Sequence, residues 1–145
     1  MTATVRPTAE TVRDPDWIAT QLRAAAASAH PPTAYRHLLA EVDMWTSEAD
    51  ATVSRITTRP LPELGWERRI FNEVRDGEIR TVPTLLAHVS DLDYPDAIAI
   101  ITAWSTALGL TEDPEHGDGV REWRGTVDGW RVELWTIVDR DAFEA

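Results

Sequence analysis

The 145-residue sequence contains no cysteine and no lysine. Without cysteine, disulfides, thiolate nucleophiles and cysteine zinc sites are excluded. Without lysine, a phosphate-loop lysine, a Schiff-base lysine and a serine–lysine pair are excluded. No segment reaches the roughly 18 apolar residues of a membrane span, and residues 1–13 lack the apolar core of a signal peptide. We therefore expect a cytoplasmic protein that does not bind membranes.

Negative charge is in excess and unevenly distributed. The chain carries 14 basic and 25 acidic residues, for a net charge of −11. Residues 1–60 hold six arginines and seven acids, whereas residues 61–145 hold eight and 18. A surface of this sign repels nucleic-acid phosphates, so we expect no direct nucleic-acid binding. The length suits a single α+β domain at 14–145 after a disordered tail at 1–13, with a helical part at 14–57 and a sheet-containing part at 62–140.

Two helical patterns occupy the first part of the chain. Asp14 and Pro15 predict a helix over 15–29, and Pro31-Pro32 ends it. From Thr33 onward a seam with heptad-like spacing follows, made of Tyr35, Leu38, Val42, Trp45, Ala49, Thr52 and Ile56. This seam predicts one long helix. Residues 33–56 either pack into the globular core, which flanking Leu39 and Val53 favour, or form a homodimer.

Two Asp-Gly pairs predict β-hairpins in the acidic half, because both turn positions need a positive φ. With Asp128-Gly129 as the turn, Trp123 faces Leu134, Gly125 faces Val132 and Val127 faces Trp130, which makes one face of residues 120–138 apolar. With Asp76-Gly77 as the turn, Arg75 faces Glu78, Val74 faces Ile79 and Glu73 faces Arg80. The alternative for residues 62–75 is a helix that Gly77 ends.

Between the hairpins, the sequence predicts a helix over 94–108. Asp93 is its expected cap, Pro95 and Asp96 fall in its first turn, and Gly109 ends it. Leu85–Val89 is a strand or a helical turn after Pro83. The expected fold is therefore α+β, with an N-terminal helical pair followed by a small antiparallel sheet built from hairpin, helix and hairpin, and with helices packed on the sheet.

Chemistry-bearing residues form no recognisable catalytic motif. His88 and Ser90 alternate, but no Gly-x-Ser-x-Gly elbow surrounds any serine. Carboxylates cluster at Asp91–Asp96 near His88, at Glu112–Asp118 around His116, and two further histidines are His30 and His37. Helix capping and solvated loops account for both acidic clusters, so we predict no catalytic, cofactor or metal site and leave metal binding at the two clusters open.

Tryptophan is abundant, with seven residues. Trp45, Trp104, Trp123 and Trp130 fall on apolar faces and are predicted to be core. Trp135 instead shares a charged hairpin face with Glu122, Arg124 and Glu133. An amphipathic aromatic ringed by charged groups is typical of protein interfaces, and the alternative is a second core layer involving Trp135, Ile137 and Val120.

These observations favour a non-enzymatic interaction module, an adaptor, inhibitor or regulator that binds a protein partner through its acidic, tryptophan-rich C-terminal half. The predicted partner-binding residues are Trp135, Glu133, Arg124, Glu122 and Ile137. One alternative is an acidic nucleic-acid mimic that inhibits a DNA-binding protein. Another is a small enzyme, or a metal or small-molecule binder, that uses histidine and carboxylates.

Overall fold

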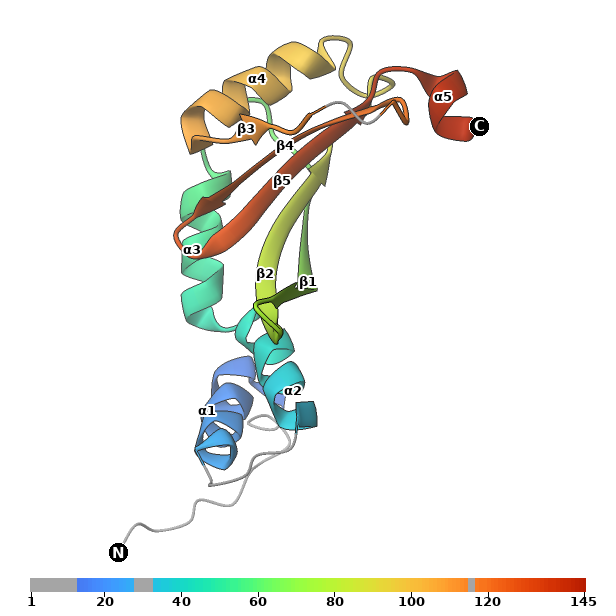
Figure 1. Cartoon of the computed structure of the whole chain (residues 1–145). Coiled ribbons are helices and arrows are strands. Elements are labelled where there is room, and N and C mark those ends of the chain that lie inside the picture. The colour runs from blue at the N-terminus through green and yellow to red at the C-terminus, as the bar shows by residue number, and fades with distance from the viewer. Residues whose placement is uncertain (1–12, 28–32, 115–116) are drawn as a thin grey trace, which may run out of the picture. The chain divides into compact units, whose positions relative to one another are not determined.

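A computed structural model describes residues 13–27, 33–114 and 117–145 (Figure 1). The chain divides into two compact units, residues 1–51 and 52–145. The predicted disordered tail, apart from Arg13, lies outside the described residues, as do His30 and His116. None of the helices in the described ranges is long and apolar enough to cross a membrane.

The first unit consists of α1 (Pro15–Ala26), α2 (Thr33–Asp43) and the beginning of α3 (Ser47–Thr57). Helix α1 begins as predicted, because the Asp14 carboxylate accepts a hydrogen bond from the Asp16 N–H at 3.0 Å. Ala19 and Leu22 are its buried positions. The helix ends at Ala26, three residues before the predicted end.

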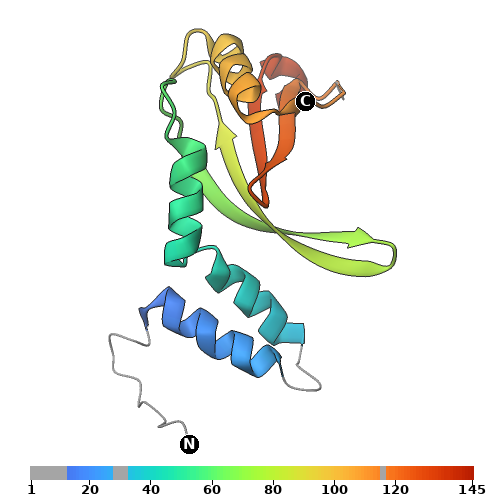
Figure 2. The same cartoon turned by 90° about the vertical axis from the view of Figure 1, so that its left-hand side faces the viewer.

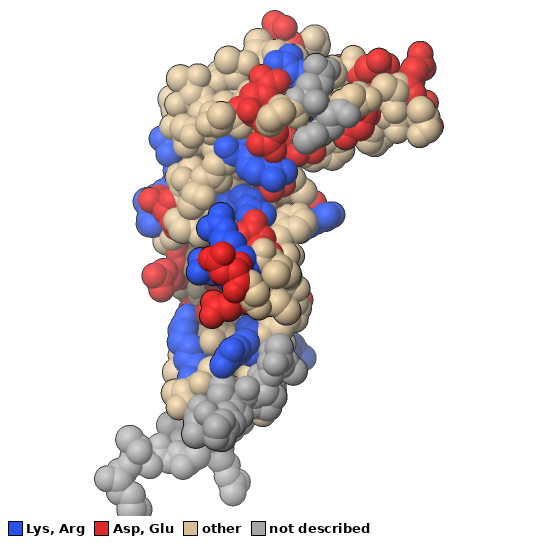
Figure 3. All heavy atoms as spheres, viewed as in Figure 1, with Lys and Arg blue, Asp and Glu red and all other residues tan. Residues whose placement is uncertain are grey.

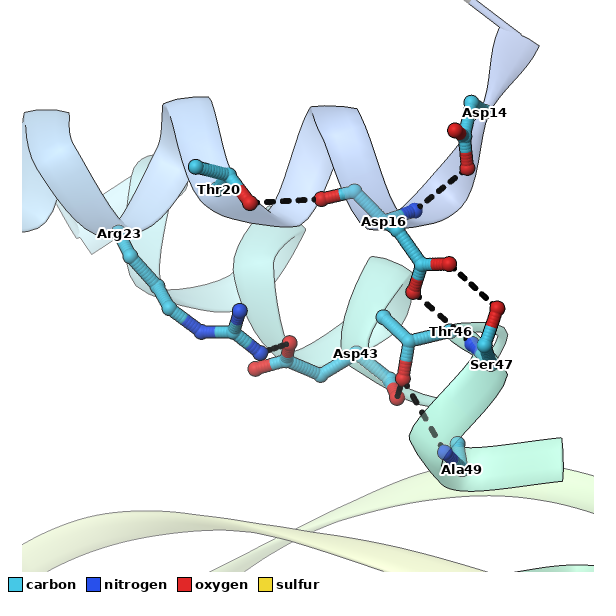
Figure 4. Close-up of polar contacts among 8 residues, drawn as sticks. All are labelled: Asp14, Asp16, Thr20, Arg23, Asp43, Thr46, Ser47 and Ala49. Carbon is cyan, nitrogen blue, oxygen red and sulfur yellow. Dashed lines mark hydrogen bonds and ion pairs between the residues drawn. The ribbon is translucent and has the colours of Figure 1, made fainter. Parts of the chain in front are cut away.

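The predicted single helix over residues 33–56 is wrong, because α2 and α3 are separate helices (Figure 4). Thr46 caps the start of α3, since its hydroxyl accepts a hydrogen bond from the Ala49 N–H at 3.2 Å. Asp16 of α1 adds a tertiary cap by accepting the Ser47 N–H at 2.9 Å and the Ser47 hydroxyl. These two caps satisfy N–H groups that a continuous helix would have bonded internally, and heptad spacing does not reveal them.

Trp45 is likewise not a core residue, in contrast to the prediction. It lies in the turn between the helices, where its N–H bonds to the Val42 carbonyl at 2.9 Å, and it is 50% exposed. With Ile18, Leu38 and Val42 it lines a surface hollow of about 380 Å³ in the first unit. The seam is thus divided, with Leu38 exposed and Ala49 buried.

The second unit contains a five-stranded sheet in the order β1-β2-β5-β4-β3. The strands are β1 (Trp66–Arg75), β2 (Glu78–His88), β3 (Thr111–Glu112), β4 (Val120–Val127) and β5 (Trp130–Ile137). Strands β2 and β5 are parallel and the other pairs are antiparallel, so the sheet is mixed and not wholly antiparallel as predicted, because β2 of the first hairpin joins β5 of the second in the same direction. The unit also contains the end of α3 and helices α4 (Ala97–Leu108) and α5 (Arg140–Glu144), and the α+β class is confirmed.

Both predicted hairpins are confirmed with their registers. Arg75 pairs with Glu78 across Asp76-Gly77, and Val127 pairs with Trp130 across Asp128-Gly129. Both turn aspartates have positive φ, 53° for Asp76 and 50° for Asp128, as their turns require. The alternative helix over 62–75 is therefore wrong. Of the predicted segment Leu85–Val89, residues Leu85 to His88 form the last part of strand β2, so the strand alternative is confirmed there.

Helix α4 covers one face of the sheet, where alternate residues of β5 are buried (Figure 1). On this face Trp130, Val132, Leu134 and Thr136 are each at most 7% exposed, and Trp123 of β4 lies beside Leu134. Gly109 ends α4 in the left-handed conformation, as predicted. The helix starts at Ala97 instead of 94, because the Ser90 carbonyl accepts the N–H groups of Asp93 and Tyr94 and holds that segment in a turn.

Strands β1 and β2 form a ribbon that extends past the rest of the sheet (Figure 2). Strand β5 pairs with β2 only from Thr84 to His88, so Glu78–Pro83 of β2 pairs with β1 alone. Val74 and Ile79 near the tip of the ribbon are 75% and 72% exposed.

Candidate functional site

The face of the sheet opposite α4, here called the open face, carries most of the residues predicted to bind a partner. On β5 it consists of Arg131, Glu133, Trp135 and Ile137, whose partners on β4 are Thr126, Arg124, Glu122 and Val120. On β2 it continues through Thr84, Leu86 and His88, which lie beside Arg131, Glu133 and Trp135. Side chains alternate along a strand, so the same strand β5 supplies both the core and this polar face.

A hollow of about 300 Å³ opens on this face. It is lined by apolar, aromatic and acidic residues of β2, β4, β5, α5 and the segment before β4: Leu86, Asp118, Val120, Glu122, Glu133, Leu134, Trp135 and Phe143. No arginine is among its lining residues in the described chain. The volume lies at the lower end of the roughly 300–1,000 Å³ typical of ligand pockets, which suits one side chain better than a large cofactor.

An ion-pair network borders the hollow. Arg124 lies 3.1 Å from Glu122, 3.4 Å from Glu133 and 3.2 Å from Asp113. Arg131 pairs with Glu73 of β1 and lies 3.9 Å from Glu133. In this network two guanidinium groups face four carboxylates, which leaves it formally negative. The Glu133 side chain is only 16% exposed, so its charge is less screened than that of a surface carboxylate.

Trp135 is held by a stacked histidine. The rings of His88 and Trp135 lie 3.8 Å apart between centroids and 8° from parallel. His88 is at the end of β2, and the parallel pairing of β2 with β5 places it beside Trp135. One face of the indole is therefore covered by imidazole, while the ring also lines the hollow. Trp135 is half-buried, intermediate between the exposed anchor and the second core layer that the sequence suggested.

The structure brings four of the five predicted residues together. Trp135, Glu133 and Glu122 line the hollow, and Arg124 bonds to both glutamates. Ile137 pairs with Val120 at the end of the open face, and it is Val120 that reaches the hollow.

Leu86, His88, Asp118 and Phe143 belong to this site but were not among the predicted partner-binding residues; His88 and Asp118 were considered only for metal binding or catalysis. Leu86 and His88 join the face through the parallel β2–β5 pairing, and no local pattern specifies such a long-range pairing. Phe143 lies on α5, whose start does carry a readable signal: Asp139 accepts the Ala142 N–H at 3.1 Å as an N-cap. An aspartate three residues before Ala142 could therefore have indicated this short helix.

The other acidic clusters are used structurally where the structure describes them. Asp91 pairs with Arg140 at 3.2 Å. Glu112 accepts two hydrogen bonds from Arg121, at 2.7 and 3.0 Å, and these lower the pKa of the Glu112 carboxyl. The Ser90 hydroxyl accepts the Leu92 N–H at 3.2 Å, and His88 stacks on Trp135. Among the described residues no three histidine or acidic side chains gather as metal ligands.

Arginine and acidic side chains are interspersed over the sheet, and acidic ones predominate towards α5 (Figure 3). Comparisons with protein-family models, with curated proteins and with solved structures found no match to this chain. The open face itself is therefore the basis for assigning a function, since an aromatic ring, carboxylates and a small hollow meet there.

Proposed function

We propose that the protein is a non-enzymatic interaction module, and that the open face binds a partner protein by taking one of its arginine or lysine side chains into the hollow. The observation that carries this proposal is the lining of the hollow, which combines Asp118, Glu122 and Glu133 with the rings of Trp135 and Phe143. Carboxylates attract a cation, and an aromatic face binds it by a cation–π interaction of about 0.5–2 kcal/mol.

The network around the hollow supports this choice of ligand. Arg124 and Arg131 hold Glu122 and Glu133 in place but leave the network formally negative, so an incoming cation completes it. An anionic ligand would meet the same carboxylates at close range, and like-charge contact opposes binding. The partner surface is therefore expected to be basic around a central arginine or lysine.

The stacked pair adds rigidity to the recognition surface. His88 fixes the plane of the Trp135 indole, so little side-chain entropy remains to be lost when a partner binds. Tryptophan in a partly desolvated pocket ringed by polar groups is typical of the few residues that dominate interface energies. Replacing Trp135 by alanine is expected to cost the complex about 2 kcal/mol or more, a roughly 30-fold loss of affinity.

Affinity capture with variant baits tests the proposal. Wild-type bait, Trp135→Ala, Glu122→Gln and the control Glu78→Gln are exposed to nuclease-treated lysate of the source. Glu78→Gln removes the same charge from the exposed start of β2, away from the hollow. We expect a protein retained by wild type and control, lost with the two hollow variants, and displaced by a soluble arginine peptide.

Two results would contradict the proposal. Equal capture of the protein by all four baits would place its binding surface elsewhere. Displacement by salt but not by the arginine peptide would indicate general charge attraction, as expected for a nucleic-acid mimic. Folding of each variant is checked by thermal denaturation, so that loss of capture is not confused with loss of structure.

A further inference from the structure

In the part of the chain that the structure describes, no strand lies beside the outer edge of β1. Strand β1 lies at the end of the sheet order and pairs with β2 on one side, and no other strand of the described residues pairs with it. Its register runs unbroken from Trp66 to Arg75, so the edge contains neither a bulge nor a proline. Such an edge offers backbone N–H and C=O groups to another strand.

The hairpin turn decides which residues of β1 present those groups. Arg75 and Glu78 flank the two-residue turn and form a hydrogen-bonded pair, as in any such hairpin. Hydrogen-bonded and non-hydrogen-bonded pairs alternate along the ladder. Ile70, Asn72 and Val74 therefore direct their backbone groups to the free edge, and the odd-numbered residues between them direct theirs to β2.

The charges on the open-face side of β1 are antisymmetric about Phe71. In chain order this side carries Glu67, Arg69, Phe71, Glu73 and Arg75. A two-fold axis through Phe71 places Glu67 opposite Arg75 of a second copy and Arg69 opposite Glu73 of that copy. Every charged residue on this side then lies opposite a residue of the other charge, and the two Phe71 residues lie opposite each other at the centre.

We propose that two copies of this protein pair antiparallel through β1, with the two-fold axis at Phe71, so that their sheets become continuous. The backbone allows this register, because Ile70 and Asn72 both face outward and then form a hydrogen-bonded pair across the axis. Opposite charges directly across an antiparallel pair stabilise it, and like charges destabilise it.

Neighbouring registers of the same symmetry are excluded by charge. With the axis at Ile70, Glu67 lies opposite Glu73. With the axis at Asn72, Arg69 lies opposite Arg75. Within one copy, Glu67 already pairs with Arg69, and Glu73 pairs with Arg131 of β5. This surface is on a different strand from the hollow, and the dimer does not depend on the proposed partner.

A single introduced cysteine tests the register, because the chain has none of its own. Directly opposite residues of a non-hydrogen-bonded pair have Cα atoms about 4.5 Å apart, within the disulfide range. Phe71→Cys is therefore expected to form a disulfide-linked dimer rapidly under mild oxidation. In the control Val74→Cys the two thiols lie six residues apart along the ladder, about 20 Å, and do not cross-link. Equal cross-linking of the two variants would overturn the register.

Reversing the charges of Glu67 and Arg75 tests the pairing. Because the two variants are also mixed, the test separates loss of pairing from failure of a variant to fold. Wild type is expected to sediment as a dimer, whereas Glu67→Arg and Arg75→Glu each place like charges opposite one another and weaken self-association by about tenfold. A mixture of the two variants restores opposite charges at both positions and forms a heterodimer. Variants that fail to fold could not do so. Monomeric wild type, or a mixture with no heterodimer, would overturn the proposal.

A third variant separates this dimer from one built on residues 33–56. Trp45→Asp places a charge on the exposed part of the helical seam and leaves β1 untouched. The β1 dimer is expected to persist in this variant at unchanged affinity. Loss of the dimer in Trp45→Asp, with Glu67→Arg still dimeric, would assign the interface to the helices instead.

Discussion

The position of α5, and with it the position of Phe143 in the wall of the hollow, depends on Gly119. Its carbonyl accepts the N–H groups of Val138 and Asp139 at 2.8 and 3.2 Å, and its φ is +80°. A Cβ at this position would lie 2.1 Å from the Asp139 carbonyl oxygen and 2.9 Å from the Phe143 N. Both atoms are backbone, so Gly119→Ala is expected to displace the start of α5 and to move Phe143 in the hollow.

Gly129→Ala is the matched control, and the comparison gives a magnitude. Gly129 also has a positive φ, +82°, but a Cβ added there would meet nothing within 4 Å. An alanine in the left-handed conformation destabilises the folded state by about 1–2 kcal/mol. Alanine also makes the unfolded chain less flexible, which stabilises the folded state by about 0.4–1 kcal/mol. The free energy of unfolding of the control is therefore expected to fall by about 1 kcal/mol. Overpacking adds about 1–3 kcal/mol at Gly119, for a total of about 2–4 kcal/mol.

Urea denaturation of the two variants measures this difference in the free energy of unfolding. Amide exchange at Val138, whose N–H bonds to Gly119, reports the local displacement and should accelerate only in Gly119→Ala. Equal stability losses in the two variants, with unchanged exchange at Val138, would refute the close packing of α5 against the start of β4.

Three further predictions concern the core and the helix junction. Leu134→Ala removes a fully buried side chain from the α4 side of β5 and is expected to cost about 2–5 kcal/mol in urea denaturation; a loss below about 1 kcal/mol would contradict the assignment of this face to the core. Thr46→Ala removes the cap of α3 and should cost about 0.5–2 kcal/mol, with Thr20→Ala as an exposed threonine control. Hydrogen bonds from Ser47 lower the pKa of Asp16, so its stabilising contribution is complete above its ordinary pKa near 3.8 and is lost as the pH falls through the lower folded value. Urea denaturation followed by far-ultraviolet circular dichroism should therefore show the stability advantage of wild type over Asp16→Asn shrinking below about pH 4; an advantage that stays constant or grows on acidification would contradict this role of Asp16.

Local chemistry made the hairpins predictable. Asp76-Gly77 and Asp128-Gly129 need positive φ at both positions, and that requirement fixes turn, register and facing side chains together. Alternation along β5 then separated the buried Leu134 from the open-face Glu133 and Trp135. Most of the residues predicted to bind a partner therefore fall on one surface, since the register alone places Glu122 beside Trp135.

Long-range contacts limited the rest. The parallel pairing of β2 with β5 brings His88 to Trp135, and its partners are more than 40 residues apart in the chain. The division of the helix at residues 33–56 depends on Asp16, which reaches Ser47 from another helix. Heptad spacing records only which side of a helix is apolar, so it cannot show a break that a distant carboxylate stabilises.

The most direct test of a cation-binding hollow is a titration of the protein with a short arginine peptide, followed through the indole N–H resonances of its seven tryptophans. Trp135 is assigned from the Trp135→Phe variant, and Trp104, whose indole N–H bonds to the Pro62 carbonyl, serves as the internal control. A peptide with citrulline in place of arginine keeps the shape and removes the charge. We predict a saturable shift of the Trp135 resonance with arginine, little shift with citrulline, and a stationary Trp104. Identical responses to the two peptides, or no movement of Trp135, would contradict binding of a cation in the hollow.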